Sequence, residues 1–204
     1  MIIHDVAQNT DEWLALRAGK PTASEFSKLI TSTGAASKSM KAYAEQLGGE
    51  LFAGKPLDAW EGNIYTERGH EVEEEARLYY SMLTGQETQQ VGFITDDLQQ
   101  YGCSPDDFVG SDGMLEIKCL PKLHIEAIRY CKKNGKIPTK FVQQTQGQML
   151  IAEREWCDLL FYHADLPKVI MRVTPDEKVV TGLKAQLLAC IAERNLVLKE
   201  LNSF

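Results

Sequence analysis

Apolar side chains recur at a helical spacing in the first part of the sequence. The spacing is clearest over residues 63–83, where Ile64, Val72, Ala76 and Tyr79 lie on a roughly helical spacing. This spacing gathers apolar side chains on one face of a helix and predicts four helical segments. These are residues 11–17, a segment that begins at Thr22, residues 37–53 and residues 63–83.

Strand-like alternation of apolar and polar residues replaces this spacing from Gln90 onward. It predicts strands over residues 91–94, 100–104, 114–118, 156–163 and 169–173. Residues 105–110 start with proline and end with glycine, so we interpret them as a loop or bend. Helical spacing returns over residues 122–133 and 139–154, and again from Asp176 to near the C-terminus.

Residues that begin and end helices support several of these boundaries. Thr22 and Glu25 have the spacing of a capping box at the start of the second segment. Gly54 and Gly85 follow the third and fourth segments, where glycine commonly ends a helix. The sequence contains no repeat, low-complexity tract or linker. We therefore expect one α/β domain over residues 1–204, with a central mixed sheet flanked by helices.

The acidic composition restricts how the chain can bind DNA. Its formal net charge is −7. A protein that coats DNA carries a basic face, so the charge argues against that class of protein. It does not argue against an enzyme that handles DNA in a local groove, because carboxylates that hold metal ions also lower the net charge.

No segment predicts a membrane span or a secretory signal. No apolar run approaches the roughly 20 residues needed to cross a bilayer. The N-terminus lacks the basic start and apolar stretch of a signal peptide. The five cysteines are odd in number, scattered and never in a C-x-x-C pair, which is typical of reduced thiols. We expect a soluble, cytoplasmic protein with no membrane partner.

The segment from Ser104 to Lys118 carries the residues most suited to catalysis. Asp106 lies at the bend before the strand that contains Glu116 and Lys118. Alternate residues of a strand point to the same side, so Glu116 and Lys118 are expected to face one pocket with Asp106. Two carboxylates, waters and phosphate oxygens make an all-oxygen site for Mg²⁺ or Mn²⁺. A lysine there can neutralise a phosphate or act on a water, so the set predicts metal-assisted hydrolysis of a phosphodiester.

A purely structural interpretation of the same residues is open as well. Glu-x-Lys is common at a solvated sheet edge, and Asp106 followed by Asp107 is a common turn sequence. The neighbours Leu115, Ile117 and Cys119 are apolar, however, which is typical of an interior strand. Burying a glutamate and a lysine there is costly unless they serve a function.

Four blocks of residues, in order along the chain, give the sequence a resemblance to a known family. The block that ends at Lys118 resembles the PD-(D/E)-x-K nuclease motif. Together the blocks resemble the phage lambda exonuclease, or YqaJ-like viral recombinase, family. The blocks are residues 13–25 (W-x-x-x-R-x-G-x-x-T-A-S-E), 69–77 (G-x-x-x-E-x-x-A-R), 104–118 and 144–149 (Q-x-Q-x-x-M).

This resemblance implies a restriction-endonuclease-like core and a metal site. It implies that Asp106, Glu116 and the backbone carbonyl of Ile117 are metal ligands. Glu73 would bind a second ion from its helix. The implied cofactor is Mg²⁺, with Mn²⁺ as a substitute and two ions per site, which together stabilise the attacking and leaving oxygens.

The resemblance also implies roles for other matched residues. Lys118 would be the catalytic lysine, and Gln144 would lie near the nucleophilic water or the scissile phosphate. Arg17 and Ser24 match positions that hold the 5′-terminal phosphate, where an arginine and a hydroxyl form an anion pocket. Asp107 stands where the family pattern has a glycine after Pro-Asp. As a loop residue, Asp107 would adjust the local charge or solvate a turn.

The activity implied by the resemblance is a Mg²⁺-dependent exonuclease acting on linear double-stranded DNA. It would digest from the 5′ end, release 5′-mononucleotides and leave a 3′ overhang for recombination by strand annealing. A homotrimeric ring around the DNA and a single-strand annealing recombinase as partner are implied too. The alternatives are a structure-specific endonuclease of the same fold, such as a junction resolvase or nickase, and a non-catalytic scaffold that binds DNA ends.

Overall fold

The computed structural model describes residues 1–57, 65–120 and 122–204, and its strands form two sheets. The larger sheet has the strand order β2-β5-β6-β7-β8. In this sheet β6 and β7 run parallel, whereas the other neighbours are antiparallel, so the prediction of a mixed sheet is confirmed. The strands are β2 (Thr88–Gln90), β5 (Asp107–Val109), β6 (Gly113–Lys118), β7 (Trp156–Phe161) and β8 (Val169–Val173).

A smaller antiparallel sheet, which the pattern did not predict as a separate unit, has the order β1-β3-β4. Its strands are Ile2–His4 (β1), Phe93–Thr95 (β3) and Gly102–Cys103 (β4). Strands of two or three residues are too short to show an alternating pattern, which explains why the sequence did not separate the two sheets.

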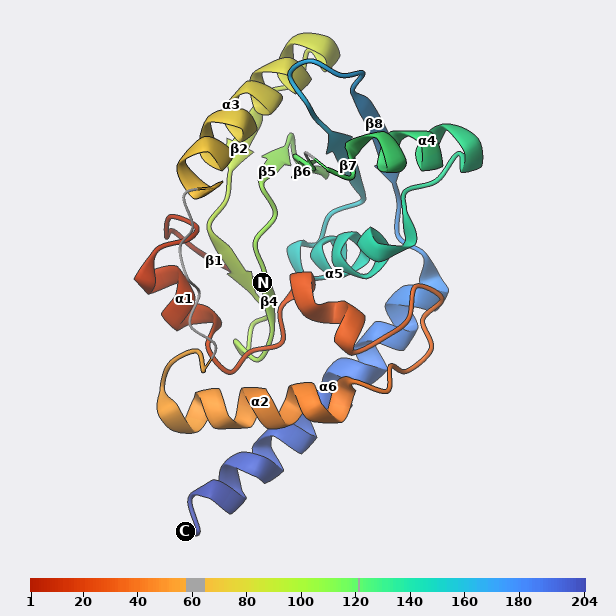
Figure 1. Ribbon diagram of the computed structural model, residues 1–204. Coiled ribbons are helices and arrows are strands. Elements are labelled where there is room, and N and C mark those ends of the chain that lie inside the picture. Colours follow the sequence, from red (N-terminus) through yellow and green to blue (C-terminus); the bar gives the residue numbers. More distant parts are fainter. Residues whose placement is uncertain (58–64, 121) are drawn as a thin grey trace.

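Helices flank the larger sheet, as predicted. In Figure 1, α3 lies on one side of it and α4 and α5 lie on the other, while α2 and α6 cross near the smaller sheet. The helical elements are α1 (Asp11–Arg17), η1 (Ala23–Lys28), α2 (Met40–Ala53), α3 (Tyr65–Thr84), α4 (His124–Asn134), η2 (Thr139–Phe141), α5 (Val142–Ala152) and α6 (Glu177–Leu201).

Alternation along β6 decides which side chains meet which helix. Leu115 packs in one buried cluster with Tyr80 of α3. Met114 points to the opposite face and belongs to the buried cluster that contains Met149 of α5. Glu116 is two residues beyond Met114, so strand alternation turns its side chain toward α5 as well.

The capping box predicted for the second helical segment is wrong. Residues 23–28 form the 3₁₀ helix η1, and the Thr22 side chain makes no capping hydrogen bond. Its hydroxyl accepts instead from the Arg17 guanidinium at 3.2 Å. The competing hydrogen bond explains why the sequence spacing gave the wrong interpretation.

The loop or bend predicted over residues 105–110 is wrong for residues 107–109, which form β5. Asp107 pairs with Leu115 of β6 on one side and with Gln90 of β2 on the other. Aspartate is uncommon in strands, so the sequence pattern did not predict a strand that begins at Asp107. Asp107 is fully buried, so it does not solvate a turn.

Other helix boundaries differ by smaller amounts. The helix expected from residue 37 begins at Met40 and ends before Gly54, whose φ of +68° is left-handed. The helix expected over residues 139–154 consists of η2 followed by α5, which ends before Glu153 at a φ of +53°. The predicted start of α3 at residue 63 lies outside the described residues.

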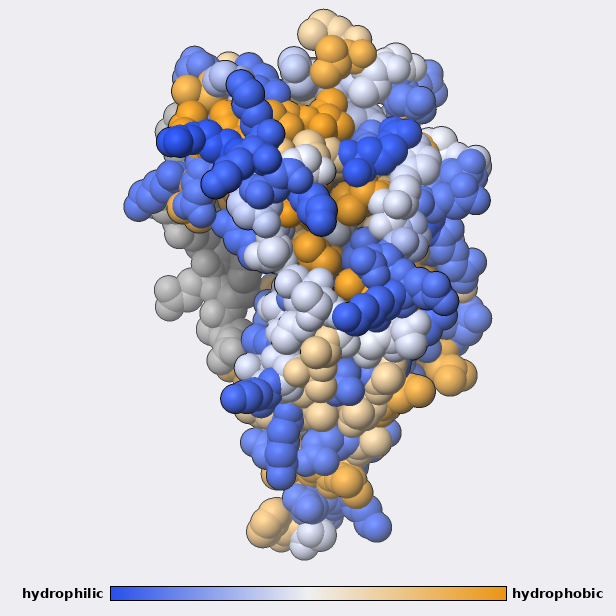
Figure 2. All heavy atoms as spheres, turned by 90° about the vertical axis from the view of Figure 1, so that its right-hand side faces the viewer, coloured by the Kyte–Doolittle hydropathy of each residue, from blue (hydrophilic) through white to orange (hydrophobic). Residues whose placement is uncertain are grey.

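The surface is largely hydrophilic on the face that Figure 2 presents, with apolar side chains gathered toward its upper part. All five cysteines are free thiols. In the described parts of the chain, no helix is both long enough and apolar enough to span a membrane.

Candidate active site

The pairing of β5 with β6 brings Asp106 beside Glu116. The register pairs Asp107 with Leu115. One further step of this antiparallel register aligns Asp106 with Glu116. A direct contact fixes the arrangement, since the backbone N–H of Ile117 donates to Asp106 Oδ2 at 2.6 Å. The two carboxylates predicted as a pair are therefore adjacent.

Glu116 is 2% exposed and accepts hydrogen bonds from three side chains. Lys118 Nζ and Gln144 Nε2 both donate to Oε1, each at 2.6 Å. Gln148 Nε2 donates to the other oxygen, Oε2, also at 2.6 Å. A buried carboxylate needs such donors because its charge is costly to remove from water.

The helix α5 delivers both amides because Gln144 and Gln148 are four residues apart and share one helix face. Gln148 is 1% exposed, and its Nε2 also lies 3.4 Å from the Ser104 carbonyl oxygen. Gly147, which lies between the two glutamines in the sequence, allows the Phe26 ring of η1 to approach α5 closely, since a Cβ at this position would overlap that ring. The glycine therefore lets η1 pack against α5 beside the carboxylates.

Burial and mutual repulsion shape the ionisation of this cluster. Burial, followed by the neighbouring charge of Glu116, raises the pKa of Asp106, and Glu73 contributes in the same direction. For Lys118, burial lowers the pKa, but the charges of Glu116 and Asp106 outweigh it and leave the pKa raised. Lys118 is therefore a cation at neutral pH, suited to holding negative charge or donating a proton.

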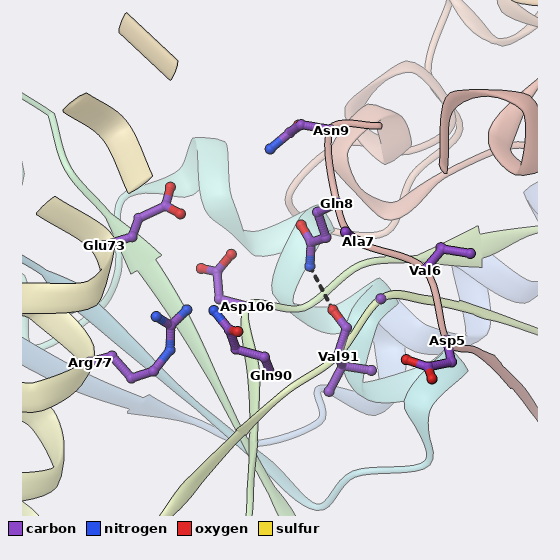
Figure 3. A pocket seen from close by; sticks show the side chains of 11 residues that line it. Asp5, Val6, Ala7, Gln8, Asn9, Glu73, Arg77, Gln90, Val91 and Asp106 are labelled. Carbon is purple, nitrogen blue, oxygen red and sulfur yellow. Dashed lines mark hydrogen bonds between the residues drawn. The ribbon is translucent and has the colours of Figure 1, made fainter. Parts of the chain in front are cut away.

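Glu73 lies on α3 across a cavity from Asp106. The cavity has a volume of about 370 Å³, and Asp106, Glu73, Arg77 and Gln8 are among its lining residues. Figure 3 shows the Glu73 and Asp106 carboxylates directed toward each other from opposite walls. The structure thus brings the predicted second-ion ligand to the same cavity as the first carboxylate.

Arg17 and Ser24 meet at a second, smaller cavity. Arg17 Nη2 donates to Ser24 Oγ at 3.2 Å, and its guanidinium stacks on the Trp13 ring at 4.0 Å. In the described part of the chain, no carboxylate forms an ion pair with Arg17. Burial lowers the pKa of Arg17, yet a guanidinium stays charged in proteins. A cation of this kind favours an anionic ligand.

The smaller cavity connects the arginine to the carboxylates. Its volume is about 170 Å³, and Asp106 lines it as well as the larger cavity. Every predicted site residue except Glu73, Ile117 and Lys118 lines it: Arg17, Ser24, Asp106, Glu116 and Gln144. Arg17, Ser24 and the carboxylate pair therefore line one cavity.

A model of the YqaJ-like viral recombinase domain matches residues 12–155. The chain belongs to the YqaJ-like viral recombinase family. The resemblance drawn from the four sequence blocks is thereby confirmed. A comparison with curated proteins gives no match.

Solved structures similar to this family member share its fold over nearly the whole chain. The alkaline exonuclease LHK-Exo from Laribacter hongkongensis has a TM-score of 0.80 and 32% identity, covering 95% of this chain and 97% of that one. LHK-Exo in complex with dAMP matches with the same values. A phage related exonuclease from Haemophilus somnus 129PT has a TM-score of 0.66 and 19% identity, covering 89% of this chain and 96% of that one. This last likeness shows the fold alone.

The residues of this family member fit a divalent metal ion. Among the described residues, no three His, Cys, Asp or Glu side chains form a compact cluster that could enclose an ion. Mg²⁺ does not require such a cluster, because it is usually bound by one or two carboxylates together with waters and substrate phosphates. Asp106 and Glu116 supply those carboxylates. Burial and then the charge of Glu116 raise the pKa of Asp106, and a cation would neutralise that charge. The Ile117 carbonyl would add a third oxygen, and Glu73, across the larger cavity, would hold a second ion.

Sequence reasoning missed three contributors to this site. Gln148 was not distinguished from other glutamines of its helix, although its spacing of four from Gln144 was a usable signal. Trp13, which donates from Nε1 to Ser104 Oγ at 2.8 Å, was treated only as part of a matched block. Arg77 was also only part of a block, and it pairs with Asp107 at 2.8 Å.

Proposed function

We propose that this chain is a Mg²⁺-dependent 5′-to-3′ exonuclease that acts on linear double-stranded DNA. It would release 5′-mononucleotides and leave a 3′ single-stranded overhang for recombination by strand annealing. The observation that carries the proposal is the shared depression in which Arg17 and Ser24 lie beside Asp106 and Glu116. Family membership and the similarity to an alkaline exonuclease support a DNA exonuclease.

The polarity follows from the role given to Arg17. A terminal phosphate carries more negative charge than an internal phosphodiester, and a guanidinium with a hydroxyl beside it binds such a group well. With the 5′-terminal phosphate held by Arg17 and Ser24, the first phosphodiester would reach the Asp106–Glu116 pair. The product would be a 5′-mononucleotide. The structure of LHK-Exo in complex with dAMP agrees with a nucleoside monophosphate as ligand in the family.

The other site residues would position and neutralise the scissile phosphate. Lys118, kept protonated by its acidic neighbours, would hold negative charge on the phosphate in the transition state. Gln144, whose amide donates to Glu116 Oε1, has a carbonyl oxygen that would orient the attacking water. Preorganised charges and dipoles of this kind are commonly the largest contribution to catalysis.

The cofactor would be held by Asp106, Glu116 and the Ile117 carbonyl, with Glu73 binding a second ion. Mg²⁺, or Mn²⁺ in its place, would polarise the phosphate and lower the pKa of a water at this position. Glu116 would retain the two glutamine amides as orienting donors while one of its oxygens faces the ion.

A homotrimeric ring that encloses the DNA and a single-strand annealing recombinase as partner belong to the same proposal. Both rest on the family resemblance. The acidic net charge of −7 is compatible with a ring whose outer surface repels DNA while the channel binds it.

Digestion of a linear duplex labelled at either end tests the proposal, with a covalently closed circle of the same sequence as control. We expect Mg²⁺-dependent release of label from 5′ ends only, and an intact circle. Release from 3′ ends would reject the polarity. Cleavage of the circle would favour a structure-specific endonuclease, and end binding without hydrolysis would favour a non-catalytic scaffold.

A further inference from the structure

Arg77 of α3 and Asp107 of β5 form a buried ion pair next to the catalytic carboxylates. Arg77 Nε lies 2.8 Å from both Oδ1 and Oδ2 of Asp107. The Asp107 side chain is 0% exposed and that of Arg77 is 17% exposed. The pair therefore joins a helix to a strand in a place that is largely closed to water.

A second acceptor on the neighbouring strand completes the contact. Gln90 of β2 is the register partner of Asp107. With its amide oxygen facing Arg77, Gln90 accepts from Nη2 at 3.0 Å and from Nη1 at 3.2 Å. Both hydrogen-bonding edges of the guanidinium are thus engaged, which fixes its plane as well as its position.

Each partner of this ion pair lies next to a proposed metal ligand. Arg77 follows Glu73 by four residues, so both project from one face of α3. Asp107 directly follows Asp106, and successive residues of an extended strand point to opposite faces. Figure 3 shows Glu73 and Arg77 extending from α3 toward the wall that carries Asp106 and Gln90. Glu73 and Arg77 line one cavity with Asp106. They line a neighbouring cavity with Asp107, so the ion pair lies beside the two carboxylates and joins the same two elements.

We propose that the Arg77–Asp107 pair is a positioning device that sets the separation between Glu73 and Asp106. This inference rests on the proposed function, in which these two carboxylates hold metal ions. Glu73 stands on α3 and Asp106 on the chain leading into β5, so their separation depends on how the helix is attached to the strand. Arg77 and Asp107 act through their neighbours and touch neither ion nor DNA.

The chemistry of Mg²⁺ makes such positioning consequential. Mg²⁺ requires near-ideal octahedral geometry at short distances, so a ligand displaced by a fraction of an ångström binds it poorly. The proposed role also explains why position 107 is an aspartate. We expected glycine there from the family pattern, and a glycine could not pair with Arg77. In this chain, the aspartate supplies the attachment of α3 to the sheet.

The decisive variant replaces both partners together, as Arg77→Met with Asp107→Asn. It leaves the net charge unchanged and leaves no buried charge without a partner. A change in metal affinity therefore reflects the positions of the metal ligands. Arg77→Met alone provides a second comparison. Removing a cation near the site would strengthen metal binding by charge alone, whereas loss of positioning weakens it.

Tyr80→Phe is the matched control. Tyr80 lies on the same helix and donates to the buried Asp158 of β7 at 2.7 Å. Its replacement removes another polar attachment of α3 to the same sheet, at a point that lines neither cavity of the site. If the site responds only to general loosening of α3, Tyr80→Phe will affect metal binding as the double variant does.

Calorimetric titration of the DNA-free proteins with Mn²⁺ measures the outcome, after circular dichroism shows that each variant is folded. We expect the double variant to lose about ten- to a hundredfold in Mn²⁺ affinity, as orienting partners of metal ligands do elsewhere. Arg77→Met should also bind more weakly, and Tyr80→Phe should match the unaltered chain. Unchanged affinity in the double variant, equal loss in Tyr80→Phe, or no Mn²⁺ binding by the unaltered chain would overturn the inference.

Two parallel measurements separate this inference from the proposed function. Mg²⁺-dependent cleavage of linear DNA by the unaltered chain tests the function itself. If cleavage is absent while Mn²⁺ affinity changes as described, the positioning role stands and the nuclease proposal fails. DNA affinity without metal should be the same in the double variant and the unaltered chain. A loss confined to DNA affinity would instead make Arg77 a direct phosphate contact.

Discussion

Gln148 and Glu116 are joined by a hydrogen bond of 2.6 Å between the side-chain amide and the carboxylate oxygen Oε2. Since Lys118 and Gln144 both bond to Oε1, Gln148 alone among these three donors fixes the other oxygen. The orientation of the carboxylate, and therefore of any ion it binds, depends on this amide.

Gln148→Leu should lower the rate of DNA hydrolysis by about ten- to a hundredfold, because the Glu116 carboxylate loses an orienting donor. The measurement is kcat under saturating DNA at several Mg²⁺ concentrations. Gln143→Leu is the matched control, since Gln143 lies on the same helix, is also buried, and donates to the Ile30 carbonyl instead. Equal rates for both variants would show that Gln148 does not orient Glu116.

Arg17→Met should remove the preference for 5′-phosphorylated ends. Hydrogen bonds to charged groups contribute about 1.5–3 kcal/mol, which corresponds to about tenfold or more in affinity. The comparison is the initial rate on duplexes with and without a 5′ phosphate. Lys20→Met serves as control, because Lys20 donates to the Leu16 carbonyl and not to Ser24. A preserved preference in Arg17→Met would remove Arg17 from the proposed phosphate subsite.

Gly147→Ala should destabilise the protein although alanine favours helices. Helix propensity alone predicts a gain of about 1 kcal/mol. A Cβ at this position overlaps the buried Phe26 ring, so η1 must move away from α5. Gly49→Ala in α2 is the control, because its added methyl meets only the exposed side chain of Leu57. Urea unfolding in which both variants are stabilised alike would show that Phe26 can relax.

Arg194→Met should lower the free energy of unfolding by about 1–3 kcal/mol, the cost of leaving a buried acceptor unsatisfied. Arg194 is 4% exposed and donates to the Gly19 carbonyl at 2.9 Å and to Gln100 Oε1 at 2.6 Å. It thus ties α6 to two loops distant in sequence. Lys184→Met, on an exposed position of the same helix, should leave the urea midpoint unchanged. A midpoint shift of equal size in both would contradict the role given to Arg194.

Local periodicity predicted most of the fold. The helices α3 and α6 carry long apolar patterns, α1 and the strands β6, β7 and β8 carry shorter ones, and the structure contains all of them. The short strand β2 was missed because its residues are polar. The strand β5 was missed because it has only three residues and begins with aspartate, and pairing with β2 and β6 makes it a strand. Strand pairing between distant segments is a tertiary effect that local propensity does not encode.

The candidate site was predictable to the extent that it follows a motif. Asp106, Glu116 and Lys118 lie within one short segment, and the structure brings them together with Gln144. Asp107 was misinterpreted because its partner Arg77 lies 30 residues earlier, and the sequence does not reveal that α3 packs against β5. Interactions between elements that are distant in the sequence could not be predicted from the sequence.

Hydrolysis of linear duplex DNA by the unaltered chain, Lys118→Ala and Glu116→Ala, with and without Mg²⁺, tests directly whether this site is the catalytic centre. We expect the unaltered chain to release nucleotides only when Mg²⁺ is present. Both variants should lose activity by about a hundredfold or more while still binding DNA ends. Full activity in either variant, or hydrolysis that is independent of a divalent ion, would contradict the assignment of this site.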